Sequence, residues 1–137
     1  MLFKKAELGE LVEDEYLTME QLTQLQNVLV EKALHLIDQG RNTVSELTDV
    51  REHDADLLDQ AANESNREFN LRLAGRERIM LEKIKHALEC VGEGEYGTCQ
   101  ICGEAVGYKR QLVRPVARAC IDCKTQAEQL ERRSRAF

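Results

Sequence analysis

The sequence predicts an all-α protein, in which a long antiparallel coiled-coil hairpin is joined to a small globular part with a four-cysteine zinc finger and a C-terminal helix. Two long apolar stripes with helical spacing predict the hairpin, and two Cys-x-x-Cys pairs near the C-terminus predict the finger. The composition agrees with both. Of the 137 residues only 4% are aromatic, none is tryptophan and 32% are charged, which suits long solvated helices better than a thick core.

The first long helix is predicted to begin at Thr18. Thr18 and Gln21 have the spacing of a capping box, in which a hydroxyl and an amide satisfy free N–H groups of the first turn. An apolar stripe follows, with one member every three or four positions. Its members are Leu22, Leu25, Leu29, Ala33, Leu36, Gly40, Val44 and Leu47. The stripe stops near Val50, so the helix is expected to end there.

An acidic link connects this helix to a second one. Residues 51–59 are crowded with carboxylates, and both Asp56 and Asp59 are suitable N-caps. The second helix carries an apolar face formed by Phe69, Leu73, Met80, Ile84, Ala87 and Val91. It is expected to end at residues 92–94, Gly-Glu-Gly, because glycine can adopt the left-handed conformation that closes a helix.

The two helices are expected to pair with each other. Each would contain about 30 residues and be roughly 50 Å long, and helices with narrow seams and a short link most simply fold back as an antiparallel hairpin. We therefore expect three parts. An N-terminal segment over residues 1–17 packs on the globular part, a coiled coil over 18–92 has its tip near 53–61, and residues 93–137 form the zinc finger and C-terminal helix.

The chain beyond the glycines is expected to form the globular part. Turn residues and cysteines lie between residues 96 and 124. A closing helix is predicted over 121–133, with Ala127 and Leu130 on its inner face. So short a globular part has little apolar surface to bury, and a metal ion is therefore a reasonable staple.

Four cysteines have the spacing of ligands to one structural zinc ion. Cys99 and Cys102 form one Cys-x-x-Cys pair, and Cys120 and Cys123 form the second after 17 intervening residues. Four thiolates satisfy tetrahedral zinc and leave no position for water or substrate, so the zinc is expected to be structural and not catalytic. A thioredoxin-like redox pair is the rival interpretation. It requires one such pair at a helix start within a βαβ unit, which the sequence lacks.

The remaining cysteine and the histidines have simpler interpretations. Cys90 lies on the second helix, outside the finger spacing, and is interpreted as a free thiol. His35, His53 and His86 are interpreted as ordinary surface or seam residues.

Charge and hydropathy limit the classes of function. The net charge of -6 divides into +4 over residues 103–137 and -10 over the rest of the chain. A net-acidic chain is a poor general binder of nucleic acid, because phosphates repel it, whereas the basic C-terminal third can hold a small anion or an acidic surface. No catalytic constellation is found, so an enzyme is not expected. With no targeting segment and no run of about 20 apolar residues, we expect a cytoplasmic protein.

Three motifs resemble those of the DksA family, bacterial transcription factors that bind RNA polymerase. The first is GEYGTCQICGE over residues 94–104, and the second is Arg114-Pro115 followed by CIDCK over 120–124. The third is DLLDQA over 56–61, which fits the family's tip signature D-x-x-D-x-A. The first two also fit shorter relatives such as TraR, which lack the first long helix. The combination covers the chain from about Tyr16 to its end, with His53 and Met80 as departures from the family pattern.

The resemblance implies a function at RNA polymerase. The coiled coil would enter the secondary channel of the polymerase and place Asp56, Asp59 and Ala61 near the active centre, which destabilises promoter complexes and changes which promoters fire. The tip carboxylates would meet either basic groups or a bound magnesium ion, and the sequence leaves both open. Helix capping alone is the simpler alternative, but a cap needs only one carboxylate.

The resemblance also implies an effector, the alarmone ppGpp of the stringent response. Met80, Lys83, Arg114 and Lys124 fall where the family contacts that nucleotide, and Arg76, one turn before Met80, would add a polymerase or phosphate contact. A polyphosphate needs convergent cations. Each cation taken alone is by default a solvated surface residue.

These expectations give a monomer whose partners are RNA polymerase and ppGpp, with no membrane contact and no direct sequence-specific DNA binding. The alternative function is a zinc-finger protein that binds nucleic acid through the basic C-terminal third. Such binding would depend steeply on salt, and the shortage of aromatic side chains for base stacking disfavours it.

Overall fold

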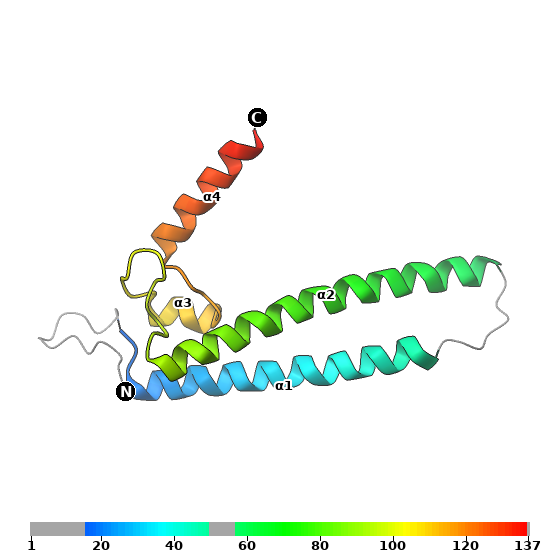
Figure 1. Ribbon diagram of the computed structural model, residues 1–137, viewed down its shortest axis with the longest axis horizontal. Helices are drawn as coiled ribbons and strands as arrows, with labels where there is room; N and C mark the ends of the chain where they lie inside the picture. Colours follow the sequence, from blue (N-terminus) through cyan, green and yellow to red (C-terminus); the bar gives the residue numbers. More distant parts are fainter. Residues whose placement is uncertain (1–15, 50–56, 137) are drawn as a thin grey trace, which may run out of the picture. The chain divides into compact units, whose positions relative to one another are not determined.

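Four helices make up the regular structure of the described residues, which are 16–49 and 57–136 of the computed structural model (Figure 1). They are α1 (Met19–Asp49), α2 (Leu57–Glu93), α3 (Tyr108–Val113) and α4 (Ile121–Arg135). These residues form no strand, and an isolated antiparallel bridge joins Thr98 to Ala105. The predicted all-α class is therefore confirmed. None of the described helices combines the length and the apolar character needed to cross a membrane.

The chain divides into two compact units. The base unit contains the described residues 16–29 and 86–136, and the hairpin unit contains residues 30–85. The base unit thus takes the beginning of α1 and the end of α2, and the hairpin unit takes the rest of both helices.

The capping box at the start of α1 is present. The Thr18 N–H donates to Gln21 Oε1 over 3.0 Å, and the Gln21 N–H donates to Thr18 Oγ1 over 3.2 Å. The two side chains satisfy each other's backbone donors, as the sequence predicts. The helix ends at Asp49, one residue before the expected limit.

The end of α2 also agrees with the sequence. Gly94, directly after the helix, has a φ of 77°, the left-handed region that glycine tolerates best. The N–H groups of Glu95 and Tyr96 both donate to the Cys90 carbonyl, over 2.9 and 3.2 Å. These bonds satisfy the helix end and turn the chain into the cysteine-rich loops.

The core of the base unit is small. Its buried apolar residues come from both long helices and from the loops that follow, and they are Leu17, Leu22, Leu25, Leu29, Ala87, Cys90, Tyr96, Cys99 and Val106. The buried Tyr96 hydroxyl donates to the Pro115 carbonyl over 2.7 Å. Burial raises the pKa of this tyrosine far above its usual value, so the hydroxyl stays a donor.

Polar contacts hold α3 within the base unit. Tyr108 Oη donates to Gln24 Oε1 of α1 over 2.8 Å. Gln111 is fully buried and donates from Nε2 to the Ala117 carbonyl over 3.4 Å. These bonds connect α3 both to the first helix and to the loop that precedes the second cysteine pair.

In the hairpin unit, α1 and α2 run side by side in opposite directions (Figure 1). The predicted stripe of α1 holds in part, because Ala33, Leu36 and Gly40 are half-buried. Val44, however, is 62% exposed and lies outside the seam. The side chain of Leu47, the last expected member, lies outside the described residues.

The predicted face of α2 is wrong over most of the hairpin unit. Phe69, Leu73 and Met80 are exposed, Phe69 by 64%. The half-buried positions lie one residue further along the chain, and they are Asn70, Ala74, Glu77 and Leu81. Both the predicted and the observed positions follow helical spacing when they are counted back from the fully buried Ile84. The predicted spacing would place the charged Arg76 in the seam. The observed spacing places the small Ala74 there and leaves the Arg76 side chain exposed.

The helix α4 is present, but its expected inner face is not. No residue of α4 is buried. Ala127 is half-buried, but Leu130 is 65% exposed, so the assignment of Leu130 to an inner face is wrong. Figure 1 shows α4 leading away from α3, with the first turn as its point of attachment. Alternation of apolar and charged residues predicts a helix, but it does not show whether another element covers it.

We expect Gly97→Ala to destabilise the protein by about 1–3 kcal/mol. Gly97 has a φ of 90°, and an added Cβ would lie 3.0 Å from Leu17 Cδ1. Gly92→Ala is the matched control, because it lies in α2 with no atom within 4 Å of an added Cβ. Helix propensity predicts that this control gains about 0.5–1 kcal/mol. Urea unfolding of the zinc-loaded protein measures both, and equal stability of the two variants would contradict this account of Leu17 and Gly97.

Candidate metal centre

The first cysteine pair lies in a tight turn after α2. The Cys99 N–H donates to the Glu104 carbonyl over 2.7 Å, and the Gly103 N–H donates to the Cys99 carbonyl over 3.0 Å. Gly103 takes a φ of 78°, which suits glycine at the sharpest point of the turn. The Ile101 N–H points to Cys99 Sγ at 3.4 Å, so the turn supplies a donor to the sulfur as well as its position.

The second pair lies at the start of α4. Cys120 is the N-cap residue of that helix, and Cys123 follows within the first turn. The Gln100 N–H donates to the Arg118 carbonyl over 2.9 Å, which joins the first turn to the segment before Cys120. The Arg110 side chain donates from Nε to the Ala119 carbonyl over 3.0 Å. The approach of the second pair is therefore fixed by two hydrogen bonds from different elements.

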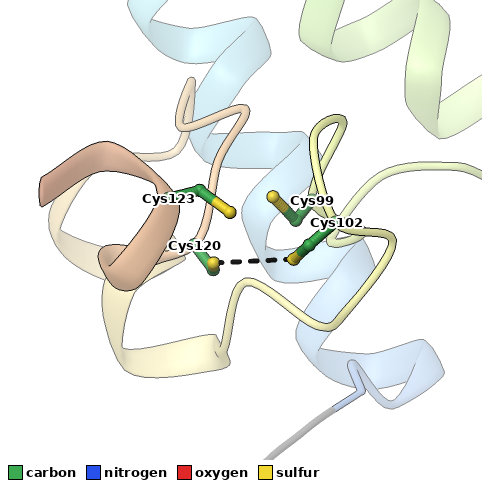
Figure 2. A group of neighbouring side chains, drawn as sticks. All are labelled: Cys99, Cys102, Cys120 and Cys123. Atoms are coloured by element: carbon green, nitrogen blue, oxygen red, sulfur yellow. Dashed lines mark hydrogen bonds between the residues drawn. The ribbon is translucent and has the colours of Figure 1, made fainter. Parts of the chain in front are cut away.

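The four sulfur atoms converge on one point. Figure 2 shows Cys99 and Cys102 facing Cys120 and Cys123 across a small gap, and all four ligand atoms lie within 4.8 Å of one another. Cys102 Sγ and Cys120 Sγ are 3.8 Å apart. A tetrahedron with Zn–S bonds of about 2.3 Å has sulfur–sulfur edges of about 3.8 Å. The donor set therefore fits zinc, and no other group of three or more Cys, His, Asp or Glu ligands occurs in the described part of the chain.

Cys99 and Cys123 differ in their acidity. Burial opposes ionisation of Cys99, but N–H groups of Cys102, Cys120 and Ile101 outweigh it and lower the pKa of Cys99 to about 6. Contacts with the Cys120 and Cys102 sulfurs raise the pKa of Cys123 to about 12. Cys99 therefore loses its proton more readily than Cys123. Zinc must displace the remaining protons, so its affinity falls as the pH falls.

A metal ion bound by these four sulfurs would hold the loops together but could not act as a catalyst. Four thiolates close the tetrahedron and leave no position for a water or a substrate. Cys99 is buried, whereas Cys102 is exposed and Cys120 and Cys123 are intermediate, so the metal would lie near the surface of the base unit. Its contribution would be to the stability of the loops around it.

The described part of the predicted tip lies at the start of α2. Asp59 and Ala61 are both exposed. Asp56 and His53 lie outside the described residues. Because α2 begins at Leu57, Asp59 lies inside the first turn and not at the cap position, where its charge is favoured by the helix dipole.

The predicted effector residues fall in both units. Arg76, Met80 and Lys83 lie on α2 in the hairpin unit, and all three are exposed. Arg114 follows α3, and Lys124 lies in α4, both in the base unit. Lys124 Nζ is 3.5 Å from Glu128 Oε1. That the residues of the hairpin unit and those of the base unit bind one anion together stays a prediction.

The base unit also contains a groove that the sequence did not predict. Its volume is about 510 Å³. Three cations line it, together with apolar side chains, and the lining includes Val106, Lys109, Arg110, Val113, Arg114 and Ile121. The sequence feature that could have predicted this groove is the cluster of three cations, Lys109, Arg110 and Arg114, within six residues. The groove can hold an anionic group next to an apolar one.

Cys90 is a free thiol within the described residues, as predicted. It is buried at the end of α2, and its Sγ lies 3.7 Å from His86 Nε2. Burial, with Glu93 and Glu95 nearby, raises the pKa of the Cys90 thiol. The thiol is therefore protonated at neutral pH and unreactive as a nucleophile.

Comparisons with known proteins agree on one family. Residues 21–91 match the model described as DnaK suppressor protein DksA, N-terminal domain, and residues 94–129 match the prokaryotic dksA/traR C4-type zinc finger. Together with the four clustered sulfurs, the second match supports a structural zinc ion.

Individual relatives cover most of the chain. The RNA polymerase-binding transcription factor DksA of Escherichia coli (strain K12) is 36% identical over 115 residues, which is 84% of this chain and 76% of that protein. The protein of the same name from Caulobacter vibrioides is 31% identical over 132 residues, or 96% of this chain and 93% of its own. The structure of transcription factor DksA2 from Pseudomonas aeruginosa has a TM-score of 0.75 at 35% identity, and covers 83% of this chain and 88% of that one.

We expect the purified protein to retain one zinc ion per chain after dialysis against metal-free buffer. Cys102→Ser should abolish this retention, because three thiolates and a hydroxyl bind zinc much more weakly than four thiolates. Cys90→Ser is the matched control and should keep the ion, since Cys90 is not part of the cluster. Metal analysis by mass spectrometry measures both. Retained zinc in Cys102→Ser, or its loss in Cys90→Ser, would show that the ligand set is misassigned.

Proposed function

The chain belongs to the DksA family, and from this premise we propose that it regulates transcription by binding RNA polymerase and inserting its hairpin into the secondary channel of the enzyme. The relatives described above are named as transcription factors that bind RNA polymerase. Their names support a regulator and not an enzyme. The chain would act in the cytoplasm as a monomer, without contacting a membrane or reading a DNA sequence.

The proposal rests on the exposed carboxylate of Asp59 in the first turn of α2. A helix of 31 residues precedes the link, and a helix of 37 residues follows it. In the hairpin unit the two helices lie side by side, and a pair of helices is only about 20 Å wide. A narrow rod of this kind can carry a carboxylate into a channel that a globular domain cannot enter.

Asp59 is available for a contact outside the chain. It lies two residues beyond the helix start, on the first turn of α2, and is exposed. Since the cap position precedes Leu57, capping does not explain Asp59. The carboxylate would meet a basic group or a magnesium ion in the polymerase. Ala61, two residues further along, would let the helix backbone approach closely.

The zinc centre would support this function without touching nucleic acid. Its four thiolates hold the loops that follow α2, and the end of α2 belongs to the same base unit. Lys109, Arg110 and Arg114 line a groove of the base unit together with apolar side chains. These three cations would face an anionic partner.

The same groove supports ppGpp as an effector. Arg114 lines it beside Lys109 and Arg110, and a guanidinium can hold a phosphate through two parallel hydrogen bonds. On the hairpin unit, Lys83 would add a further cation, and Met80 would add an apolar contact for the guanine ring. The nucleotide would bind where the polymerase brings both groups to one surface, so its effect would appear in the complex.

We expect Asp59→Asn to bind RNA polymerase within about twofold of the wild type but to lose the effect on promoter complexes. The substitution removes a charge and keeps the size of the side chain, and a single exposed charge contributes little to the affinity of a large interface. Asp38→Asn on α1, also exposed, is the matched control and should regulate normally.

In vitro transcription from a ribosomal promoter, with binding measured separately, checks this expectation. Normal regulation by Asp59→Asn would exclude the tip assignment. A gel-shift with promoter DNA and no polymerase tests the alternative function, and strong binding there would favour a nucleic-acid-binding protein.

We expect Lys83→Ala and Arg114→Ala each to weaken ppGpp binding to the polymerase complex by about tenfold or more, since each removes a hydrogen bond to a charged group. Regulation without ppGpp should be retained. Lys32→Ala, an exposed cation of α1, is the control and should bind normally. Titration of the complex with labelled ppGpp measures the affinities, and unchanged affinity in both variants would remove these residues from the effector site.

A further inference from the structure

Three side chains with metal-binding atoms meet beside the zinc turn, within the base unit. His86 and Cys90 lie one helical turn apart at the end of α2, and Gln100 comes from the loop between Cys99 and Cys102. Cys90 Sγ is 3.7 Å from His86 Nε2. The Gln100 amide nitrogen is 2.9 Å from His86 Nε2 and 3.8 Å from Cys90 Sγ. The three groups therefore share one small volume.

The acceptor atoms of these groups can be turned toward that volume. His86 Nδ1 lies 3.9 Å from Glu89 Oε2, and a carboxylate on this side favours the tautomer with its proton on Nδ1. Nε2 then carries the lone pair, 2.9 Å from the Gln100 amide nitrogen and 3.7 Å from Cys90 Sγ. The Gln100 amide can turn by 180°, because its nitrogen and oxygen are equivalent in shape, and its oxygen then takes the position that the nitrogen occupies. A sulfur, an imidazole nitrogen and an amide oxygen would face one point.

The sulfur–nitrogen separation fits one metal ion. With Zn–S bonds of about 2.3 Å and Zn–N bonds of about 2.0 Å, a tetrahedral ion puts sulfur and nitrogen about 3.5 Å apart, against the observed 3.7 Å. A cavity of about 20 Å³ adjoins the three groups, lined by His86, Cys90 and Gln100 among others. Such a volume accommodates a single ion or water.

We propose that His86, Cys90 and Gln100 form a second metal site, distinct from the four-cysteine centre, which binds one Zn²⁺ ion with water in the fourth position. Thiolate and imidazole ligands select zinc over magnesium or calcium. With one thiolate in place of four, the site binds zinc more weakly than the four-cysteine centre. An ion there links the last turns of α2 to the loop that carries Cys99 and Cys102, so it would fasten the helix end to the zinc finger.

The experiment counts zinc ions in the full chain. Protein that holds its finger zinc is dialysed to equilibrium against buffer with excess free Zn²⁺, and bound zinc is measured by mass spectrometry. The wild type should bind two ions per chain, whereas His86→Ala and Cys90→Ala should each bind one, with at least tenfold weaker affinity for a second. His35→Ala is the matched control, because His35 is an exposed histidine of α1, and it should bind two.

A spectroscopic measurement identifies the ligand. Co²⁺ added to the one-zinc protein should produce a sulfur-to-cobalt charge-transfer band that is absent from Cys90→Ala. The retained finger zinc shows that each variant has folded its base unit. A wild type that binds only one zinc ion, or a second ion that persists in both His86→Ala and Cys90→Ala, would overturn the proposal.

Discussion

The structure of the base unit depends on four sulfur atoms held within 4.8 Å of one another. The loops between α2 and α4 bury few apolar side chains, and their regular hydrogen bonding amounts to a bridge and several turn contacts. Without metal, four thiols would face each other with little to hold them. Zinc converts this weak point into a closed tetrahedron, and it fixes both turns and the first turn of α4.

The hairpin depends in turn on this base. Leu22, Leu25 and Leu29 of α1 are buried in the base unit together with Ala87 and Cys90 of α2. In the hairpin unit most seam positions are only half-buried, and they include Asn70 and Glu77. A long helix with so little burial gains most of its stability where it is packed. Both helices are thus best packed in the base unit. The exposed carboxylate of Asp59 lies in the hairpin unit, where α2 is least packed.

The sequence predicted those features whose cause is local. A capping box needs only Thr18 and Gln21, a helix end needs only Gly94, and a zinc tetrahedron is encoded in the spacing of two Cys-x-x-Cys pairs. The register of α2 was predicted wrongly, because two series of positions have the same period and only the cost of burying Arg76 separates them. The exposure of α4 and the contact of His86 with Gln100 depend on where distant segments lie. Periodicity carries no information on either.

The proposed function requires the start of α2 to reach the active centre of RNA polymerase. Photo-crosslinking tests it most directly, with a crosslinking residue at position 58, where Leu58 is 79% exposed in the first turn of α2. A second probe at the exposed Leu130 of α4 reports on the base unit. The first probe should attach to polymerase segments that line the active centre, and the second only to segments outside the channel. Attachment of the first probe to the outer surface of the polymerase, or to DNA alone, would contradict the proposed function.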